Sequence, residues 1–342
     1  MRDINEIPFN ANCADLIRLF ASLWIAYGHT SYALEAPGWD AWQQLNIFHC
    51  LILFFALSGF YVSASLERSK SAWDYLKKRL IRVYPALWFA FAVSLVIVYC
   101  SLYGKHQVSC LSWGKWILAQ ISIGQFYVPQ ELKVYGTGHP NGALWMIPLQ
   151  LGMYVIFLLT YKLLRTLNVC GWCCWLAVCI AAAVSAPAVI LRLPEMMGKL
   201  YAFSPLPYAY IFYIAMFIYI YRNKALPLLC RYFWLLLIIY VTYALLNRIF
   251  FHIELGIYVD TITCVFLTVL TIACAYKFGR RNLRHDYSYG IYVFHCIFVN
   301  MLFCLDLKGH WWSIVLVYLL SLSFAWFSCH FIEEPIFRRL KN

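Results

Sequence analysis

Long apolar stretches separated by short polar loops recur along the whole chain. Each stretch has about 20 residues, the length a helix needs to cross the hydrocarbon core of a bilayer. This pattern predicts an all-α, polytopic integral membrane protein. The ten predicted spans are 12–31, 44–66, 83–103, 144–164, 170–191, 200–221, 231–247, 256–276, 286–305 and 311–332. A further segment, 116–128, is too short and polar to cross and is expected at the membrane interface.

Composition agrees with this pattern, because 63% of the residues are hydrophobic and only 12% are charged. The N-terminal sequence "MRDINEIPFNANC" mixes both charge signs and has no cleavage site, so the first span is expected to remain as an anchor. Neither a linker nor an internal repeat interrupts the chain. Residues 1–342 are therefore expected to form a single membrane domain.

Basic residues alternate from loop to loop. One side of the membrane receives 19 of them, namely Arg2, the C-terminal group and those in the loops after the second, fourth, sixth and eighth spans, whereas the other side receives seven. The positive-inside rule then predicts that both termini are cytoplasmic. The net charge of +12 lies mostly in these loops, so it does not require a nucleic-acid partner.

Cysteines add little to the functional prediction. Most of the 14 lie within spans, where they act as small apolar residues. The run "CGWCCW" has no second ligand cluster at the spacing of a zinc site, so no metal is expected. Cys100 and Cys110 could pair on the outer side, but their spacing alone does not decide this.

The first span carries three ionisable side chains, Asp15, Arg18 and His29. An Arg near the bilayer centre costs roughly 2.5 to 3.5 kcal/mol, so it needs a partner or a function. Arg18 and His29 are 11 residues apart, which places them on one stripe of a helix about 16 Å apart along its axis. Asp15 lies one turn before Arg18 and could neutralise it. The stripe is either a buried ion pair with a structural histidine or a polar path through the helices.

A second basic pair follows the second span. Arg79 and Arg82 are three residues apart and share a helix face at the cytoplasmic start of the third span. Guanidinium groups present planar, bidentate donors that suit phosphate, so this pair is a candidate site for a phosphate-rich ligand. Ordinary topology signalling by basic residues is the alternative.

Six motifs in order resemble the membrane acyltransferase-3 family over nearly the whole chain. Each is weak alone, but their order on ten spans is specific. They are Arg18 with His29 eleven residues later, "FFALSGF" (54–60), "RLIRVYP" with Arg79, Arg82 and Pro85, "ALWMIPLQLGMY" (143–154), "YSYGIYVFH" (287–295) and "FIEEPIFR" (331–338).

The resemblance implies transfer of an acyl group, most often acetyl from cytoplasmic acetyl-CoA, to a hydroxyl of a lipid-linked or surface polysaccharide such as O-antigen. It implies a bacterial inner-membrane location, with membrane lipids as neighbours. A hydroxyl is a poor nucleophile at neutral pH and needs a base, so His29 is expected to act as general base or transient acyl carrier, with His295 the second candidate base. Trp145, Tyr292 and His295, all within the motifs, are expected to contact the acceptor.

One position departs from the family pattern. Gln150 stands where family members commonly carry a Glu, so it can form hydrogen bonds but cannot titrate. His49 and His139 are expected to be structural or to lie on the acceptor side.

The long outer loop 104–143 is rich in aromatic and amide side chains, which suit sugars but also gather at membrane interfaces. A transporter or flippase of a lipid-linked sugar is the competing prediction. Transporters usually contain two internally repeated halves, and the sequence shows no such repeat.

Overall fold

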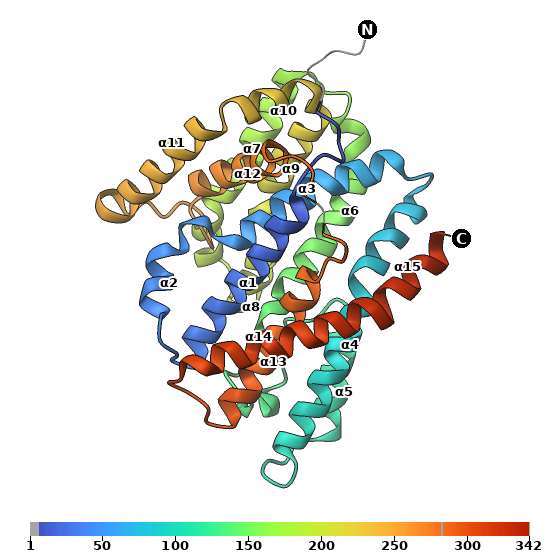
Figure 1. Cartoon of the computed structure of the whole chain (residues 1–342), viewed down its shortest axis with the longest axis vertical. Helices are drawn as coiled ribbons and strands as arrows, with labels where there is room; N and C mark the ends of the chain where they lie inside the picture. Colours follow the sequence, from blue (N-terminus) through green and yellow to red (C-terminus); the bar gives the residue numbers. More distant parts are fainter. Residues whose placement is uncertain (1–6, 282, 342) are drawn as a thin grey trace. The chain divides into compact units, whose positions relative to one another are not determined.

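Helices make up all the regular structure of the described residues. The computed structural model describes residues 7–281 and 283–341, and no strand occurs among them (Figure 1). Arg2, counted among the basic residues above, lies outside this range. These residues form two compact units, each assembled from three chain segments. That residues 1–342 act as one functional domain stays a prediction.

The first unit comprises the described part of Met1–Ile17 together with Ile47–Leu76 and Leu149–Leu283. Helix α6 (Met146–Leu164) begins just before the third of these segments. The other helices of the unit are α3 (Cys50–Arg68), α7 (Val169–Arg192), α8 (Glu195–Ala202), α9 (Ala209–Ile220), α10 (Arg222–Arg231), α11 (Phe233–Leu246) and α12 (Thr261–Lys277).

Helix α3 is the centre of the first unit, where it packs against α9 and α12. Gly59 of the "FFALSGF" motif permits this packing. A Cβ atom at Gly59 would lie 2.7 Å from the Phe212 carbonyl oxygen on α9. Helix α12 begins at an Asp260 cap, whose carboxylate accepts the backbone N–H groups of Ile262 and Thr263. Part of the family resemblance therefore has a packing explanation.

The second unit comprises Arg18–Asn46, Lys77–Pro148 and the described part of Arg284–Asn342. Two of its helices, α1 (Ala14–Ala33) and α4 (Ala72–Leu102), begin shortly before its segments do. The remaining helices are α2 (Trp39–Leu45), α5 (Cys110–Ile121), α13 (Ser288–Cys304), α14 (Trp311–Phe327) and α15 (Glu334–Lys341), with short 3₁₀ turns at Gln130–Val134 and Gly142–Trp145.

Two helix pairs organise the second unit. Helices α13 and α14 approach closely at Gly290, where a Cβ atom would lie 2.6 Å from the Cβ of Ala325. Helix α5 is tied to α4 because Tyr84 and Trp88 donate side-chain hydrogen bonds to the backbone carbonyls that end α5, at 2.9 and 3.1 Å. The interfacial position predicted for 116–128 is not tested, but the segment is half helix and half turn.

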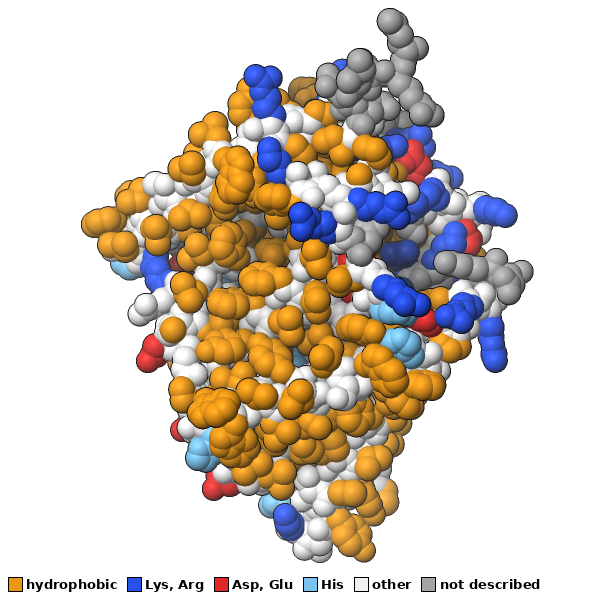
Figure 2. All heavy atoms as spheres, in the orientation of Figure 1, with side chains coloured by type: hydrophobic (Ala, Val, Ile, Leu, Met, Phe, Trp, Pro, Cys, Tyr) orange, Lys and Arg blue, Asp and Glu red, His pale blue; other side chains and the backbone are white. Residues whose placement is uncertain are grey.

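Seven helical stretches of the described residues are long and apolar enough to cross a membrane, and two shorter apolar helices, α12 and α13, accompany them. Large apolar side chains such as Val178, Ile238 and Leu319 are exposed, and Figure 2 shows hydrophobic side chains covering much of the visible face. An exposed apolar surface of this kind suits lipid. The prediction of an all-α polytopic membrane protein is confirmed. All ten predicted spans overlap helices, and their exact number stays a prediction.

Orientation is also a prediction, and labelling can test it. With both termini cytoplasmic, single cysteines introduced after Arg82, Arg165 and Arg284 in a chain without other cysteines should be protected from an impermeant reagent in intact cells. Cysteines near Gly38 and Lys133 should react. Labelling of the Arg82 position in intact cells would reverse the orientation and the side of the membrane on which a donor binds.

Candidate active site

The second unit brings two histidines into direct contact. His29 lies near the end of α1, and His295 lies in the middle of α13. Their Nδ1 and Nε2 atoms are 2.9 Å apart, with ring centroids 5.1 Å apart. The His295 side chain is fully buried, whereas His29 is exposed. An exposed imidazole is thus backed by a buried one.

Hydrogen-bond partners define the protonation of this pair. His295 Nδ1 lies 3.2 Å from the Ile291 carbonyl oxygen, which can only accept. In the neutral imidazole this contact places the proton on Nδ1 of His295 and leaves its Nε2 as an acceptor. His29 Nδ1 must then donate to His295, so His29 Nε2 carries a lone pair. The arrangement presents a basic nitrogen on the exposed ring.

Cys296 completes a cluster of three side chains. Its Sγ atom is 3.4 Å from His29 Nδ1 and 3.3 Å from His295 Nε2. Two histidines and a cysteine could in principle ligate zinc. The nitrogen separation of 2.9 Å is that of a direct N–H···N contact and is shorter than the about 3.3 Å between nitrogen ligands of tetrahedral zinc. The prediction that no metal is needed stays untested.

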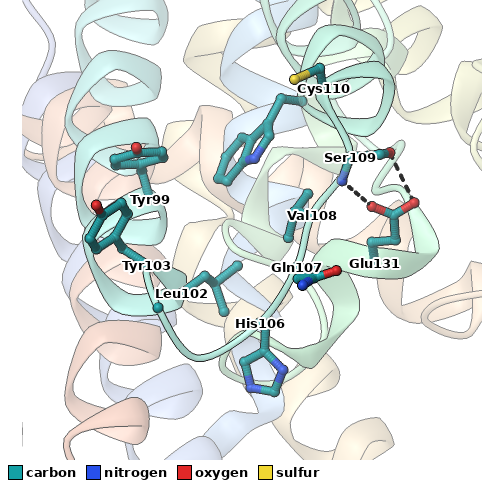
Figure 3. Close-up of a pocket in the computed structure, with 11 residues that line it drawn as sticks. Tyr99, Leu102, Tyr103, His106, Gln107, Val108, Ser109, Cys110 and Glu131 are labelled. Carbon is teal, nitrogen blue, oxygen red and sulfur yellow. Dashed lines mark hydrogen bonds between the residues drawn. The ribbon is translucent and has the colours of Figure 1, made fainter.

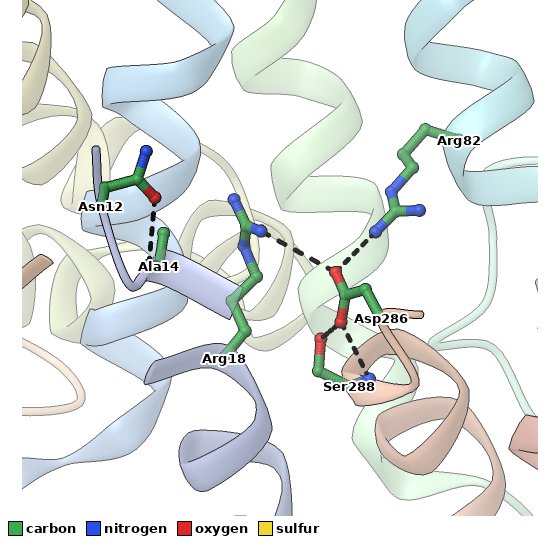
Figure 4. Close-up of polar contacts among 6 residues, drawn as sticks. All are labelled: Asn12, Ala14, Arg18, Arg82, Asp286 and Ser288. Carbon is green, nitrogen blue, oxygen red and sulfur yellow. Dashed lines mark hydrogen bonds and ion pairs between the residues drawn. The ribbon is translucent and has the colours of Figure 1, made fainter. Parts of the chain in front are cut away.

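A carboxylate missed by sequence analysis joins the two arginines. Asp286 precedes α13, and its Oδ2 atom is 2.9 Å from Arg82 Nη2 and 3.8 Å from Arg18 Nη1 (Figure 4). The backbone N–H and hydroxyl of Ser288 donate to the other oxygen, Oδ1. Two guanidinium groups and two hydrogen bonds from Ser288 surround this carboxylate and favour its charged form. Asp286 therefore fixes both guanidinium groups.

These contacts show how α1 lies against the segment that carries α13. Arg18 pairs with Asp286 just before α13, and His29 pairs with His295 on α13. The two helices therefore run in the same direction, and the predicted stripe of α1 meets this segment at both ends. The Tyr289 hydroxyl, which donates to the Val83 carbonyl at 3.0 Å, holds the start of α13 against α4 beside Arg82.

The other predicted basic and acidic residues lie nearby in the chain. Arg79 is half-buried one turn before Arg82 on α4, and Asp15 lies in the first turn of α1. Asp15 belongs to the first unit, whereas Arg18 begins a segment of the second. Arg18 pairs with Asp286, and neutralisation of Arg18 by Asp15 stays a prediction.

Asn300 attaches the loop 104–143 to α13. Its side-chain oxygen accepts from the backbone N–H of Thr137 at 2.7 Å and from the Thr137 hydroxyl at 3.0 Å. Its amide nitrogen donates to the carbonyls of Cys296, at 2.8 Å, and His139, at 3.1 Å. Gly136 is required here, since its φ is +59° and a Cβ atom would lie 2.1 Å from the Asn300 oxygen. The loop 104–143 is thus anchored to the helix that carries His295.

Two of the residues predicted to contact the acceptor lie next to this anchor. Tyr292 is buried, its ring centroid is 5.8 Å from that of His295, and its hydroxyl donates to the Ala143 carbonyl. Trp145 is half-buried at the end of the 3₁₀ turn that contains Ala143. The Tyr292 hydroxyl is thus engaged by the backbone of the outer loop. Acceptor contact by Trp145, Tyr292 and His295 stays a prediction.

Gln150 and His49 belong to the first unit. The Gln150 amide donates to the hydroxyls of Ser58, in the "FFALSGF" motif, and Tyr154. His49 precedes α3 with a left-handed φ of +34°. Gln150 therefore has a hydrogen-bonding role that does not need a carboxylate.

The remaining motif joins two helical segments, and none of the cysteines forms a disulfide. In "FIEEPIFR", Glu334 accepts from Arg338 at 3.2 Å and contacts His285, which joins α15 to the segment before α13. All fourteen cysteines are free, including Cys100 and Cys110. His285, Cys329 and Glu334 form a second group with ligand atoms close enough for a metal, although His285 Nδ1 already lies within hydrogen-bonding distance of the Glu334 carboxylate.

Asp286, Cys296 and Asn300 lie beside predicted residues in the structure but were not predicted from the sequence. Asn300 carried a usable signal, because an amide in the middle of an apolar helix marks a buried polar contact. Asp286 stood directly before "YSYGIYVFH", but its pairing with Arg18 and Arg82 joins three separate segments. Such pairing is invisible to local patterns.

Comparison with known proteins gives consistent matches. The profile of a family described as an acyltransferase domain matches residues 12–330. Nodulation protein 10 of Rhizobium leguminosarum bv. viciae is 26% identical over 345 residues, which cover 95% of this chain and 92% of that protein. The O-acetyl transferase of Shigella phage Sf6 is 29% identical over 43% of this chain and 44% of its own length.

A third relative, the acyltransferase MdmB of Streptomyces mycarofaciens, is 28% identical over 42% of this chain and 35% of its own length. These last two matches cover less than half of either protein. No solved structure matches the chain.

Proposed function

Since the chain belongs to the acyltransferase-3 family and is a membrane-bound O-acyltransferase, we propose that it transfers an acetyl group from cytoplasmic acetyl-CoA to a polysaccharide hydroxyl. The acceptor is a lipid-linked or surface glycan such as O-antigen, and the enzyme works in the bacterial inner membrane. The observation that carries this proposal is the contact of exposed His29 with buried His295, because it leaves a basic nitrogen on an accessible ring.

Acyl transfer with this pair needs one proton acceptor that later becomes a donor. His29 Nε2 takes the proton of the acceptor hydroxyl as the hydroxyl oxygen bonds to the thioester carbonyl carbon. The carbon–sulfur bond then breaks, and the leaving thiolate takes the proton from His29. While His29 is positively charged, His295 Nε2 accepts its Nδ1–H, and the Ile291 carbonyl holds His295 in the required tautomer.

The donor binds at the other end of the same stripe in this proposal. Arg18 and Arg82 converge on Asp286, which presents two guanidinium groups in fixed positions for the phosphates of CoA. Arg79, one turn from Arg82, adds a third positive charge. Arg18 is about 16 Å from His29 along α1, so the extended pantetheine arm of CoA would run along the helix toward the base.

Replacing Arg82 tests the donor site. We expect Arg82→Lys to weaken acetyl-CoA binding about fivefold and Arg82→Ala at least about tenfold, because Lys keeps the charge but not the bidentate geometry. Equilibrium binding of radiolabelled acetyl-CoA to purified protein measures the effect. Lys77→Ala, which removes an exposed charge from the same helix, is the control. Equal acetyl-CoA binding by the Arg82 and Lys77 variants would show that Arg82 does not bind the donor and serves only to set membrane orientation.

The reaction itself can be tested in the cell. Surface glycan from cells with and without the gene is compared by mass analysis, and the proposal expects acetyl increments only when the gene is present. Glycans of equal mass, with the protein shown to be inserted, would contradict the proposed reaction. Altered amounts of glycan without a mass change would instead favour a transporter.

A further inference from the structure

The outer end of the second unit contains a pocket of about 610 Å³, away from the residues assigned above. It lies between the end of α4, the loop 103–109, the start of α5 and the 3₁₀ turn Gln130–Val134. Figure 3 shows Tyr99 and Tyr103 on one side and Ser109 with Glu131 on the other. The volume lies in the range of small-ligand sites.

Building on the proposed function, we propose that this pocket binds one or two neutral sugar rings of the acceptor glycan. Its aromatic side is made by Tyr99, Tyr103 and Trp113, whose flat faces can pack against the C–H face of a sugar. Tyr99 is 5.7 Å from Tyr103 and 5.8 Å from Trp113, measured between ring centroids. The three rings line one wall and remain accessible at its rim, since Tyr103 is 73% exposed.

The opposite wall supplies polar groups for hydroxyls. Glu131 is held in place because its two oxygens accept from the backbone N–H of Ser109, at 2.6 Å, and from the Ser109 hydroxyl, at 3.0 Å. The Ser109 hydrogen bonds lower the pKa of Glu131, so it carries a negative charge. His106 and Gln107 are exposed beside it. A fixed carboxylate repels the negative charge of acidic sugars and accepts hydrogen bonds from hydroxyl groups, which is why the ligand class is neutral.

The position of the pocket along α4 favours the acceptor glycan over acetyl-CoA as its ligand. From Arg82 to Leu102 the helix α4 rises by about 30 Å, the thickness of a bilayer core. Arg82, one of the proposed donor residues, and the pocket therefore lie about 30 Å apart along one helix. An aromatic belt at the interface would not require a cavity with a fixed carboxylate.

The pocket is connected to the helix that carries His295. Leu132 and Tyr135 are buried in a cluster with Leu102 and Trp116 beneath the pocket. Gly136 and Thr137 follow directly and form the hydrogen bonds to α13 through Asn300 and Cys304. A glycan held in the pocket would thus be bound by the same loop that is anchored beside the histidine pair.

Acetylation kinetics in reconstituted vesicles test the assignment. The probes are acetyl-CoA and lipid-linked glycan extracted from cells that lack the gene. We expect Tyr103→Leu and Gln107→Ala to raise the KM for the glycan about fivefold or more, with kcat and the KM for acetyl-CoA nearly unchanged. Tyr103→Phe, which keeps the flat face, should stay near the wild type. Trp311→Leu, an exposed aromatic outside the pocket, is the control.

Each result has a distinct meaning. An unchanged glycan KM in both Tyr103→Leu and Gln107→Ala would overturn the pocket while leaving the reaction intact. A pocket for a lipid chain predicts that Leu replaces Tyr103 without loss, and that result also overturns the assignment. Absence of acetyl transfer by the wild type would instead refute the proposed function. Binding of the glycan to the His29→Ala protein that becomes at least about fivefold weaker on adding Tyr103→Leu would support the pocket independently of catalysis.

Discussion

The His29→Ala protein should insert in the membrane and bind acetyl-CoA like the wild type, but acetylate glycan at least about a hundredfold more slowly. A positioned base commonly contributes 10²- to 10⁴-fold, since the acceptor hydroxyl must lose its proton in the transition state. The side chain is exposed, so its removal leaves no buried cavity. The rate is measured as release of free CoA thiol in vesicles that contain the acceptor glycan.

Donor binding and gel-filtration behaviour separate chemistry from folding in this variant. If the role of His29 is only structural, then activity, donor binding and stability should fall together in His29→Ala. If His29 is the general base, only the acetylation rate should fall. Near-normal acetylation by a stable His29→Ala protein would refute the role of base. Acetylated His29 that accumulates in the wild type when glycan is omitted would replace the base by a covalent carrier.

Replacing the buried partner should have the second largest effect. We expect His295→Phe to lower kcat about 10- to 100-fold, because the ring volume is kept but His29 Nδ1–H loses its acceptor and the tautomer is no longer fixed. His295→Gln should retain much more activity, since its amide oxygen can accept from His29. The KM for acetyl-CoA should remain unchanged in both.

Measurement of kcat against pH distinguishes positioning from packing. The His295→Phe substitution removes the hydrogen-bond acceptor that stabilises positively charged His29. The pH at which activity is half-maximal should therefore be lower in His295→Phe than in the wild type, whereas a packing defect alone would leave that pH unchanged. Equal kcat values for the Gln and Phe variants would contradict the proposed role of His295 as hydrogen-bond acceptor for His29. Loss of wild-type activity on chelation, with recovery on adding zinc, would instead indicate that the histidine pair binds a metal.

Most of the helical framework could be predicted from apolar length. The third span shows where this fails, because it was predicted to begin at residue 83 whereas α4 begins at Ala72. The extra turns carry Lys77, Lys78, Arg79 and Arg82, whose charge lowers hydropathy without preventing a helix. Hydropathy therefore locates the apolar part of a helix and not its ends.

The site could be predicted from the sequence only where its residues lie within one helix. The spacing of Arg18 and His29 within one helix could be read directly, since helical geometry fixes both on one stripe. The partners Asp286 and His295 come from a segment more than 250 residues away, and a sequence pattern does not show which helices meet. His295 was named only through a family motif, and Asp286 was missed altogether.

Transfer of isotopically labelled acetyl groups tests the central claim most directly. Purified protein in vesicles is incubated with labelled acetyl-CoA and lipid-linked glycan from cells lacking the gene, and the glycan is then analysed by mass spectrometry. The account predicts a labelled acetyl group on the glycan with wild-type protein and almost none with His29→Ala. An unlabelled glycan with correctly inserted wild-type protein, or equal labelling by both proteins, would contradict it.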